Sequence, residues 1–258
     1  MSLKELAPTY FTRLHTVIQE AGRQKRILNA GCGDGVYDLY LKNKTSEIIS
    51  IDINRSDIQI ARNLNFEKNL LYSVADIGTM PFSSDVFDCV ICTDVIEHLP
   101  DDLGAIHEMC RCLKKGGKLI ITAPSKNFPL FYDPVNYVLN KFGKKLRIGI
   151  WGWGHERLYT TREVEGKTGL KLIKTDYLSK SLVGLFENSY VNSLFQKFTK
   201  NDPGNRAYTG RHVDRTAKTV KYEIHAAFSL IRDVIIGLDR ALCHKSTRSV
   251  GIMAVFRK

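Results

Sequence analysis

The sequence lacks several features that would assign it to a class at once. It has no uncharged run near the roughly 18 apolar residues of a membrane-spanning helix. Its first residues, MSLKELAPTY, do not contain the apolar core of a secretion signal. It has no internal repeat and no low-complexity tract. These absences favour an ordinary globular protein of the cytoplasm.

The sequence also lacks a spaced cysteine framework. Most of its six cysteines fall inside apolar runs, which is typical of buried free thiols. Cys89 and Cys92 are three positions apart in a strand-like run, so their side chains point to opposite faces and do not make a zinc pair. We therefore predict no disulfide and no metal site. The six are Cys32, Cys89, Cys92, Cys110, Cys112 and Cys243.

The 258 residues carry a formal net charge of +11 that is unevenly distributed. Residues 1–125 contain 14 Lys and Arg against 16 Asp and Glu, whereas residues 126–258 contain 24 against 11. The basic excess therefore lies in the C-terminal half. It indicates an anionic partner such as a phosphorylated substrate, lipid headgroups or nucleic acid, or simply a solvated surface.

Short apolar runs alternate with amphipathic stretches from residue 26 to residue 124, as in successive β-α-β units. This alternation predicts an α/β fold: a doubly wound, mostly parallel seven-stranded sheet with helices on both faces. The predicted strands are 27–30, 48–53, 70–74, 87–93, 118–123, 170–178 and 249–257. The predicted helices between these strands are 37–42, 57–65, 102–113 and 161–168.

About 70 residues separate the last two predicted strands, far more than a hairpin loop needs, so we expect a helical insertion there. It contains an amphipathic segment at 181–198, a basic loop at 200–221 and a helical pattern after that. The pattern is typical of a helix packed on the body or on a second copy, and also of an interfacial membrane helix. Its apolar residues on one face are Ile224, Ala227, Phe228, Ile231, Val234, Ile235, Leu238 and Leu242.

The sharpest motif is ILNAGCGDG at residues 27–35, where a strand ends in three glycines at alternate positions. Glycine has no Cβ, so the backbone of such a turn can approach a ligand closely. The next strand ends at Asp52, whose carboxylate would accept hydrogen bonds from both hydroxyls of a ribose. Asp76 follows the third strand and would accept from an adenine amino group. Each acid alone is more typical of a cap or turn, where Asp is favoured anyway, but together they predict an adenosine site.

Five segments, in this order and spacing, resemble the class I S-adenosylmethionine-dependent methyltransferases. The resemblance is to the small-molecule type that includes the ubiquinone-biosynthesis O-methyltransferases, and it is strongest over residues 26–124. A nicotinamide dehydrogenase would need the spacing GxGxxG instead of GxGxG. The segments are ILNAGCGDG, SIDIN, VADIGTMPFSSDVFDCVICTDVIEHLPD, LKKGGKLIITAP and GHERLYTTREVEGKTGLKLI.

The resemblance implies which residues bind S-adenosylmethionine. The glycines would lie against its methionine part, Asp52 would hold the ribose, and Asp76 with Ile77 would hold the adenine. The family often has Asp where this chain has Asn29, which keeps hydrogen-bonding capacity but removes a negative charge. The implied cofactor residues are Asn29, Gly31, Cys32, Gly33, Gly35, Asp52, Ile53, Asp76, Ile77, Thr93 and Asp94.

The implied reaction is an in-line attack of a nucleophile on the methyl carbon, with S-adenosylhomocysteine as the product. Alignment of the reactants supplies most of the rate enhancement in such a transfer. If the acceptor is a hydroxyl, His98 is the first candidate for its base, with Glu97 orienting it or binding a metal. His98 would otherwise cap a helix or pack over the cofactor. Asp94 and His155 complete the candidate catalytic residues.

The expected domain organisation follows the resemblance. Residues 1–25 would form an N-terminal helical lead, and 26–178 with 246–258 the core that binds S-adenosylmethionine. Residues 125–158 and 179–245 would form a cap on the substrate side. The aromatic residues of 128–153 would roof an apolar substrate or make a small core of their own.

We therefore expect methylation of an oxygen, less readily of carbon or nitrogen, on a small-molecule or lipid-linked acceptor. Peripheral membrane contact through the basic insertion and a homodimer are further expectations. Methylation of RNA is an alternative that charge alone favours, because no Asn-Pro-Pro-Tyr type motif and no RNA-binding module is present. A cofactor-binding scaffold without catalysis is the other alternative.

Overall fold

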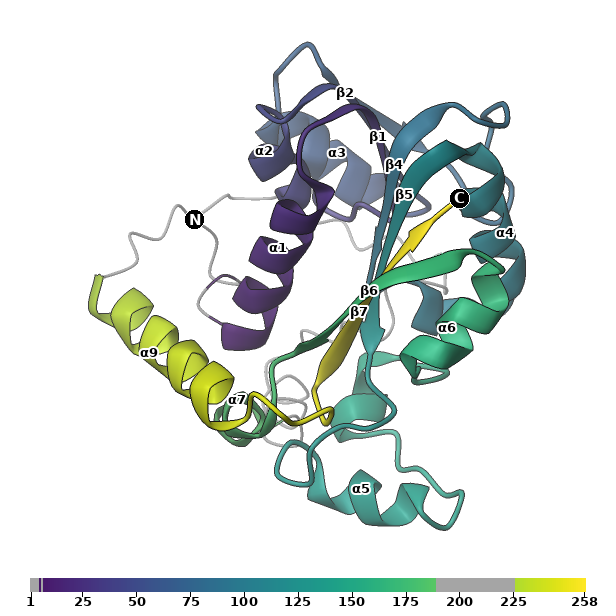
Figure 1. Cartoon of the computed structure of the whole chain (residues 1–258). Coiled ribbons are helices and arrows are strands. Elements are labelled where there is room, and N and C mark those ends of the chain that lie inside the picture. The colour runs from purple at the N-terminus through teal and green to yellow at the C-terminus, as the bar shows by residue number, and fades with distance from the viewer. Residues whose placement is uncertain (1–4, 6, 189–225) are drawn as a thin grey trace.

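A single seven-stranded sheet organises the computed structural model, which describes residues 5, 7–188 and 226–258 (Figure 1). The strand order is β3-β2-β1-β4-β5-β7-β6. The first five strands in this order are parallel, and β7 runs antiparallel to both of its neighbours. The strands are β1 (Gln24–Ala30), β2 (Thr45–Asp52), β3 (Leu70–Val74), β4 (Phe87–Thr93), β5 (Leu113–Pro124), β6 (Lys171–Leu178) and β7 (Gly251–Arg257).

Helices cover both faces of this sheet. Successive residues of a strand point to opposite faces, so Ile27 and Leu28 of β1 belong to two different cores. Helices α1, α2 and α3 bury side chains on the face of Ile27, and α4 and α6 on the face of Leu28. The predicted doubly wound, mostly parallel sheet is thereby confirmed. The helices so named are α1 (Pro8–Ala21), α2 (Val36–Leu41), α3 (Arg55–Leu64), α4 (Asp102–Cys112) and α6 (Thr161–Thr168).

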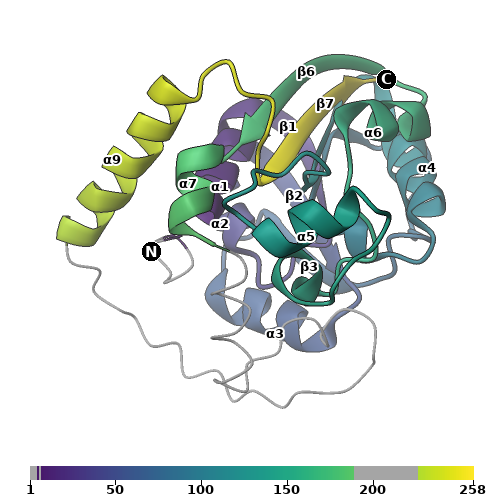
Figure 2. The ribbon, with the colours of Figure 1, turned by 90° about the horizontal axis from the view of Figure 1, so that it is seen from below.

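Two further segments extend from the sheet. Between β5 and β6 lie α5 (Pro134–Asn140) and the short 3-10 helix η3 (Gly149–Trp153). Between β6 and β7 lie α7 (Ser181–Phe186) and α9 (Ala226–Leu242), as expected of a helical insertion. The predicted basic loop 200–221 and most of 181–198 fall outside the described residues. Seen from below, α5 and α7 lie in front of the sheet and α9 stands at its side (Figure 2).

The aromatic residues of the segment between β5 and β6 mainly form a small core of their own. Phe128 and Trp151 are buried with Ile150 and Leu158, and Tyr132 and Tyr137 pack against them. This arrangement matches the second of the two expectations for these residues. Phe131, in contrast, is more than half exposed.

From Ile231 on, the predicted apolar stripe of α9 faces outward, whereas Ile224 lies outside the described residues. Val234 and Leu238 are about half exposed, and Leu242 is 73% exposed. The side of α9 that faces α1 and α7 contains Arg232, which is 5% exposed, and Asp239, which is 3% exposed. The helix therefore does not pack on the body through its apolar face.

The contact of α9 with the body is polar. The Arg232 guanidinium lies 3.5 Å from the ring centroid of Phe11 on α1 and donates to the Glu5 carbonyl at 2.9 Å. The Asp239 carboxylate accepts from the backbone N–H groups of Lys180, Leu182 and Val183 at 2.7, 2.8 and 3.1 Å. These last three bonds cap the first turn of α7 and hold α7 and α9 together.

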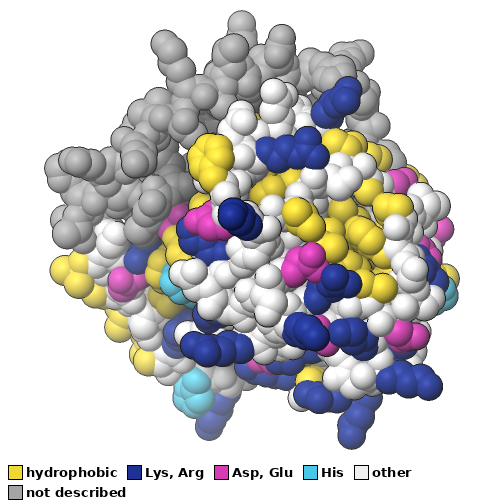
Figure 3. Space-filling model, turned by 90° about the horizontal axis from the view of Figure 1, so that it is seen from above, with side chains coloured by type: hydrophobic (Ala, Val, Ile, Leu, Met, Phe, Trp, Pro, Cys, Tyr) yellow, Lys and Arg dark blue, Asp and Glu magenta, His cyan; other side chains and the backbone are white. Residues whose placement is uncertain are grey.

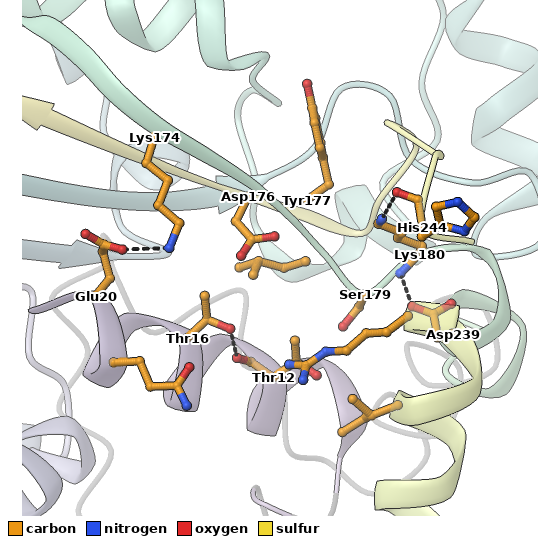
Figure 4. Close-up of a pocket in the computed structure, with 14 residues that line it drawn as sticks. Thr12, Thr16, Glu20, Lys174, Asp176, Tyr177, Ser179, Lys180, Asp239 and His244 are labelled. Atoms are coloured by element: carbon orange, nitrogen blue, oxygen red, sulfur yellow. Dashed lines mark hydrogen bonds and ion pairs between the residues drawn. The ribbon is translucent and has the colours of Figure 1, made fainter. Parts of the chain in front are cut away.

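A cleft of about 420 Å³ separates α9 from α1 and β6 (Figure 4). Its lining is mostly polar, and two of its hydroxyls, those of Thr12 and Ser179, are buried without a hydrogen-bond partner among the described residues. Lys174 on β6 pairs with Glu20 on α1 at 2.8 Å across one end of the cleft. The cleft is lined by residues of α1, β6 and α9 and includes no residue of the glycine turn.

Three smaller findings complete the fold. All six cysteines are free, as predicted. Among the described helices, none combines the length and the apolarity that crossing a membrane requires. The face seen from above relative to Figure 1 shows hydrophobic patches among many Lys and Arg side chains (Figure 3).

The Asp239 cap predicts a local effect of mutation. Replacing Asp239 with Ala leaves three N–H groups of the α7 turn without an acceptor, which typically costs about 1 to 3 kcal/mol. Hydrogen exchange should then accelerate in 181–186 and 229–242, while exchange in β1 and β4 stays unchanged. Asp176→Ala, on the same cleft, is the matched control. Unchanged exchange in Asp239→Ala would show that α9 is held by other contacts.

Candidate active site

The glycine turn joins β1 to α2 and is built on left-handed backbone. Gly31, Gly33 and Gly35 have φ values of 78°, 53° and 74°, which favour glycine strongly. A Cβ on Gly31 would lie 2.4 Å from a methyl group of Val95, so only glycine fits. A Cβ on Gly33 would meet nothing within 4 Å, which leaves open space on that side of the turn.

Asp52 at the end of β2 is locked onto this turn. One of its carboxylate oxygens accepts from Gly33 N and the other from Asn54 N, both at 2.8 Å. Burial raises the pKa of Asp52, while the two backbone donors oppose that effect. The side chain is thus held in one position beside the open side of Gly33, with lone pairs left to accept further hydrogen bonds.

The sheet order brings the other predicted strand ends to the same edge. Strands β3, β2, β1 and β4 are consecutive neighbours and parallel, so their carboxyl ends lie side by side. Asp76 and Ile77 follow β3, with Asp76 exposed and Ile77 buried. Thr93 and Asp94 lie at the end of β4. All predicted cofactor residues therefore gather along one edge, and their individual roles stay predictions.

A buried carboxylate, that of Asp38, lies behind the turn and is hydrogen-bonded to Asn29. Asn29 is fully buried, and its amide nitrogen donates to Asp38 on α2 at 2.8 Å. Ser50 on β2 donates to the other oxygen of Asp38 at 2.8 Å. Burial raises the pKa of Asp38 to about 6, against the effect of these donors. The amide oxygen of Asn29 is left without a partner among the described residues.

The sequence analysis missed Asp38, although its position in the first turn of the helix after the glycine turn was visible. It also missed Arg13 on α1. Arg13 forms an ion pair with Asp94 and donates to Tyr37 Oη at 3.3 Å. No motif marks Arg13, because α1 reaches this edge only through its packing on the sheet (Figure 1). An arginine from the predicted lead segment thus becomes part of the site.

Asp94 is held in an unusual backbone conformation. Its φ is 51°, in the left-handed region that non-glycine residues rarely adopt. Thr122 on β5 donates to its carboxylate at 2.9 Å, and Arg13 pairs with the other oxygen. Such strain is typical of residues whose position matters to a site.

Next to Asp94, the 3-10 helix η2 (Ile96–His98) presents a carboxylate and an imidazole. Glu97 is fully buried, and neither of its oxygens has a hydrogen-bond partner among the described residues, although His98 Nε2 lies 3.9 Å from Oε1. Burial, together with the charge of Asp94, raises the pKa of Glu97 well above its usual value. His98 Nδ1 lies 3.1 Å from the carbonyl oxygen of Gly154. Since a carbonyl only accepts, Nδ1 is the donor and Nε2 keeps a free lone pair.

His155 stacks obliquely against His98, with ring centroids 5.0 Å apart. Burial lowers the pKa of both imidazoles, and that of His155 falls to about 3. Both rings are therefore neutral near pH 7, and His155 is the weaker proton acceptor of the two because its pKa is about 3. Nδ1 of His155 is buried and has no partner among the described residues.

Glu97, His98 and His155 also form a group that suits a metal ion. Each offers one ligand atom, and these atoms lie within 4.8 Å of one another. A carboxylate with two imidazoles is a donor set that divalent metals accept. Without a metal, the same lone pairs are available to accept a proton. That no metal takes part stays a prediction.

Comparison with known proteins agrees with this geometry. Residues 28–121 match the family model described as "Methyltransferase domain". The ubiquinone biosynthesis O-methyltransferase of Alkalilimnicola ehrlichii is 31% identical over 106 residues, 40% of this chain and 43% of that protein. The ubiquinone/menaquinone biosynthesis C-methyltransferase of Haemophilus ducreyi is 29% identical over 123 residues, 45% of this chain and 46% of that protein. The chain thus spans about half the length of these curated relatives.

A solved structure extends the likeness to the whole fold. The S-adenosylmethionine dependent methyltransferase from Mesorhizobium loti matches with a TM-score of 0.58 and 14% identity, covering 99% of this chain and all of that chain. At this identity the match concerns the fold alone. The family match, in contrast, runs from β1 to β5 and includes the glycine turn, Asp52 and Asp94. Residues 28–121 are thus similar in sequence to a methyltransferase domain, and the chain as a whole has the fold of a solved S-adenosylmethionine dependent methyltransferase.

Proposed function

We propose that this protein transfers the methyl group of S-adenosylmethionine to a hydroxyl of a small-molecule or lipid-linked acceptor. The observation that carries the proposal is the fixed carboxylate of Asp52 beside the open side of Gly33. This pair is suited to a ribose lying against the turn. S-adenosylmethionine, when bound, supplies an electrophilic methyl group.

The residues at the edge of the sheet fit the parts of this cofactor. Asp52 would accept from the two ribose hydroxyls, and Asp76 with Ile77 would hold the adenine. The partnerless amide oxygen of Asn29 is an acceptor for the amino-acid ammonium, with the charge of Asp38 directly behind it. Arg13 would supply the positive charge that pairs with the amino-acid carboxylate of the cofactor. The departure at position 29 therefore does not disable the site.

We assign the role of general base to His98. Its Nδ1 donates to Gly154, so Nε2 carries the lone pair that would take the proton of an acceptor hydroxyl. Its lowered pKa keeps it neutral and ready near pH 7. Asp94 would orient Arg13 and the cofactor through its two fixed oxygens, and His155 would line the acceptor side.

The acceptor class rests on weaker support. The relatives are named for both O- and C-methylation in quinone biosynthesis, which supports a small or lipid-linked acceptor. A neutral histidine favours oxygen, because a hydroxyl must lose a proton. Only the basic net charge of the chain favours methylation of RNA. Turnover of any acceptor would exclude the alternative of a cofactor-binding scaffold without catalysis.

The first test is calorimetric titration of the full chain with S-adenosylmethionine and S-adenosylhomocysteine. We expect micromolar binding of both and none of NADH. Asp52→Ala should weaken binding by roughly 100-fold, because two charge-assisted hydrogen bonds to the ribose are lost. Asp176→Ala, a strand acid of the α1–α9 cleft, should bind as the wild type does. Absence of binding to folded protein, or binding of NADH instead, would contradict the proposal.

The Asp38 carboxylate predicts a pH dependence of cofactor affinity. Burial raises the pKa of Asp38 to about 6, so the group is charged above that pH and neutral below it. The charge favours the cofactor ammonium, and affinity should therefore fall by roughly tenfold as the pH drops from 7.5 to 5. Asp38→Asn should bind more weakly at pH 7.5 and lose most of this dependence. A profile that Asp38→Asn leaves unchanged would assign the effect to another group.

Turnover separates the roles of the two histidines. His98→Gln should lower kcat by roughly 10² to 10⁴ with a quinol acceptor, since general bases contribute that much, and should leave cofactor affinity unchanged. The exposed His107→Gln on α4 is the matched control. The readout is S-adenosylhomocysteine formation. If His155→Gln abolishes turnover while His98→Gln does not, the base is His155.

A further inference from the structure

The outward face of α9 is a continuous apolar surface. At about 100° per residue, its exposed large side chains fall within one arc of roughly 120°. Arg232, Ile236 and Asp239 occupy the opposite arc and are buried. The exposed apolar residues, here called the α9 apolar face, are Leu230, Ile231, Val234, Leu238 and Leu242.

The orientation of α9 is determined by specific contacts, not by a loose fit. Arg232 stacks on Phe11, and Asp239 caps the first turn of α7. The cleft beneath the helix is lined mainly by polar and charged side chains, with Tyr177, Leu178 and Ile236 as its apolar ones, and it offers no apolar groove along its length (Figure 4). Among the described residues, nothing therefore covers the α9 apolar face. Contact of so many large apolar side chains with water is unfavourable. A contiguous exposed apolar patch of this kind is typical of an interaction surface.

Neighbouring elements extend this surface. Leu185 and Phe186 at the end of α7 are 53% and 62% exposed, and α7 contacts α9. In the segment around α5, Phe142 is 73% exposed and Leu146 is 45% exposed. Figure 2 shows α7 between α9 and α5.

The charges around these apolar groups are mainly basic. Residues 134–148 contain Lys141, Lys144, Lys145 and Arg147 and no acidic residue. Arg240, Lys245 and Arg248 are exposed at the C-terminal end of α9 and after it. Of the two acids on α9, Asp239 is buried in its cap and Asp233 pairs with Arg232. Apolar side chains rimmed by lysine and arginine are the composition of an interfacial membrane element.

We propose that the α9 apolar face, with the end of α7, docks on an anionic lipid bilayer. Phosphate headgroups would neutralise the basic rim, and the leucine, isoleucine and valine side chains would enter the acyl boundary. A second copy is a poorer occupant, because a symmetric contact would bring two basic rims together in a chain whose net charge is already +11. The inference does not depend on the methyl acceptor.

The test is flotation of the full chain with vesicles of phosphatidylcholine alone and with one third phosphatidylglycerol. We expect binding to the anionic vesicles that weakens as salt rises, and little binding to the neutral ones. Val234→Glu combined with Leu238→Glu should reduce binding by tenfold or more. The control is Phe66→Glu combined with Leu71→Glu, two exposed apolar residues of α3–β3, and it should bind as the wild type does.

Two further readouts make the result decisive. Thermal unfolding and cofactor titration on the same samples should be equal in all three proteins, because α9 does not reach the glycine turn. Failure of the cofactor titration alone would affect the proposed function and leave the vesicle result standing. Equal vesicle binding by the α9 variant, or no binding by the wild type, would overturn the inference. A wild-type dimer that the α9 variant converts to a monomer would overturn it in favour of a second copy.

Discussion

The site depends on the joint between the glycine turn and the end of β2. Gly31 and Cys32 both donate their N–H groups to the Ile51 carbonyl, and Gly33 donates to the Asp52 side chain. These bonds hold two neighbouring strand ends in one geometry. They require the turn to pass close to Val95, which excludes a side chain at Gly31. The acid at the tip of β2 is therefore held beside the open side of Gly33, the position at which we propose that a ribose binds.

Around this joint, the protein keeps an unusual number of ionisable groups away from water. Asp38, Glu97 and Arg13 each lose hydration that a surface position would retain. Asp38 is compensated by Asn29 and Ser50, and Arg13 by Asp94, whereas Glu97 has no hydrogen-bond partner among the described residues and only His98 Nε2 at 3.9 Å. Perturbed groups cluster at functional sites, because a charge that develops during reaction or binding can then act at low dielectric. This clustering at one sheet edge is consistent with methyl transfer there.

The helix α9 shows how a polar contact can determine which surface faces solvent. A helix usually buries its apolar side, yet here Arg232 and Asp239 make the specific contacts with α1 and α7. Directional bonds to three N–H groups and a cation on an aromatic ring hold the helix in this orientation. Within the part of the chain that the structure describes, nothing then covers the apolar side, which is the surface for which we propose an anionic partner.

Sequence by itself determined the sheet, its helices on both faces and the positions of the glycine turn, Asp52, Asp76 and Asp94. These follow from local rules, since the period of apolar residues sets the element and parallel strands bring their carboxyl ends to one edge. It could not reveal Arg13, which reaches Asp94 from a helix far away in the chain, nor the pairing of Asn29 with Asp38. It found the apolar stripe of α9 but not its direction. Periodicity says which residues share a face, whereas only the three-dimensional contacts of the opposite face decide where that face points.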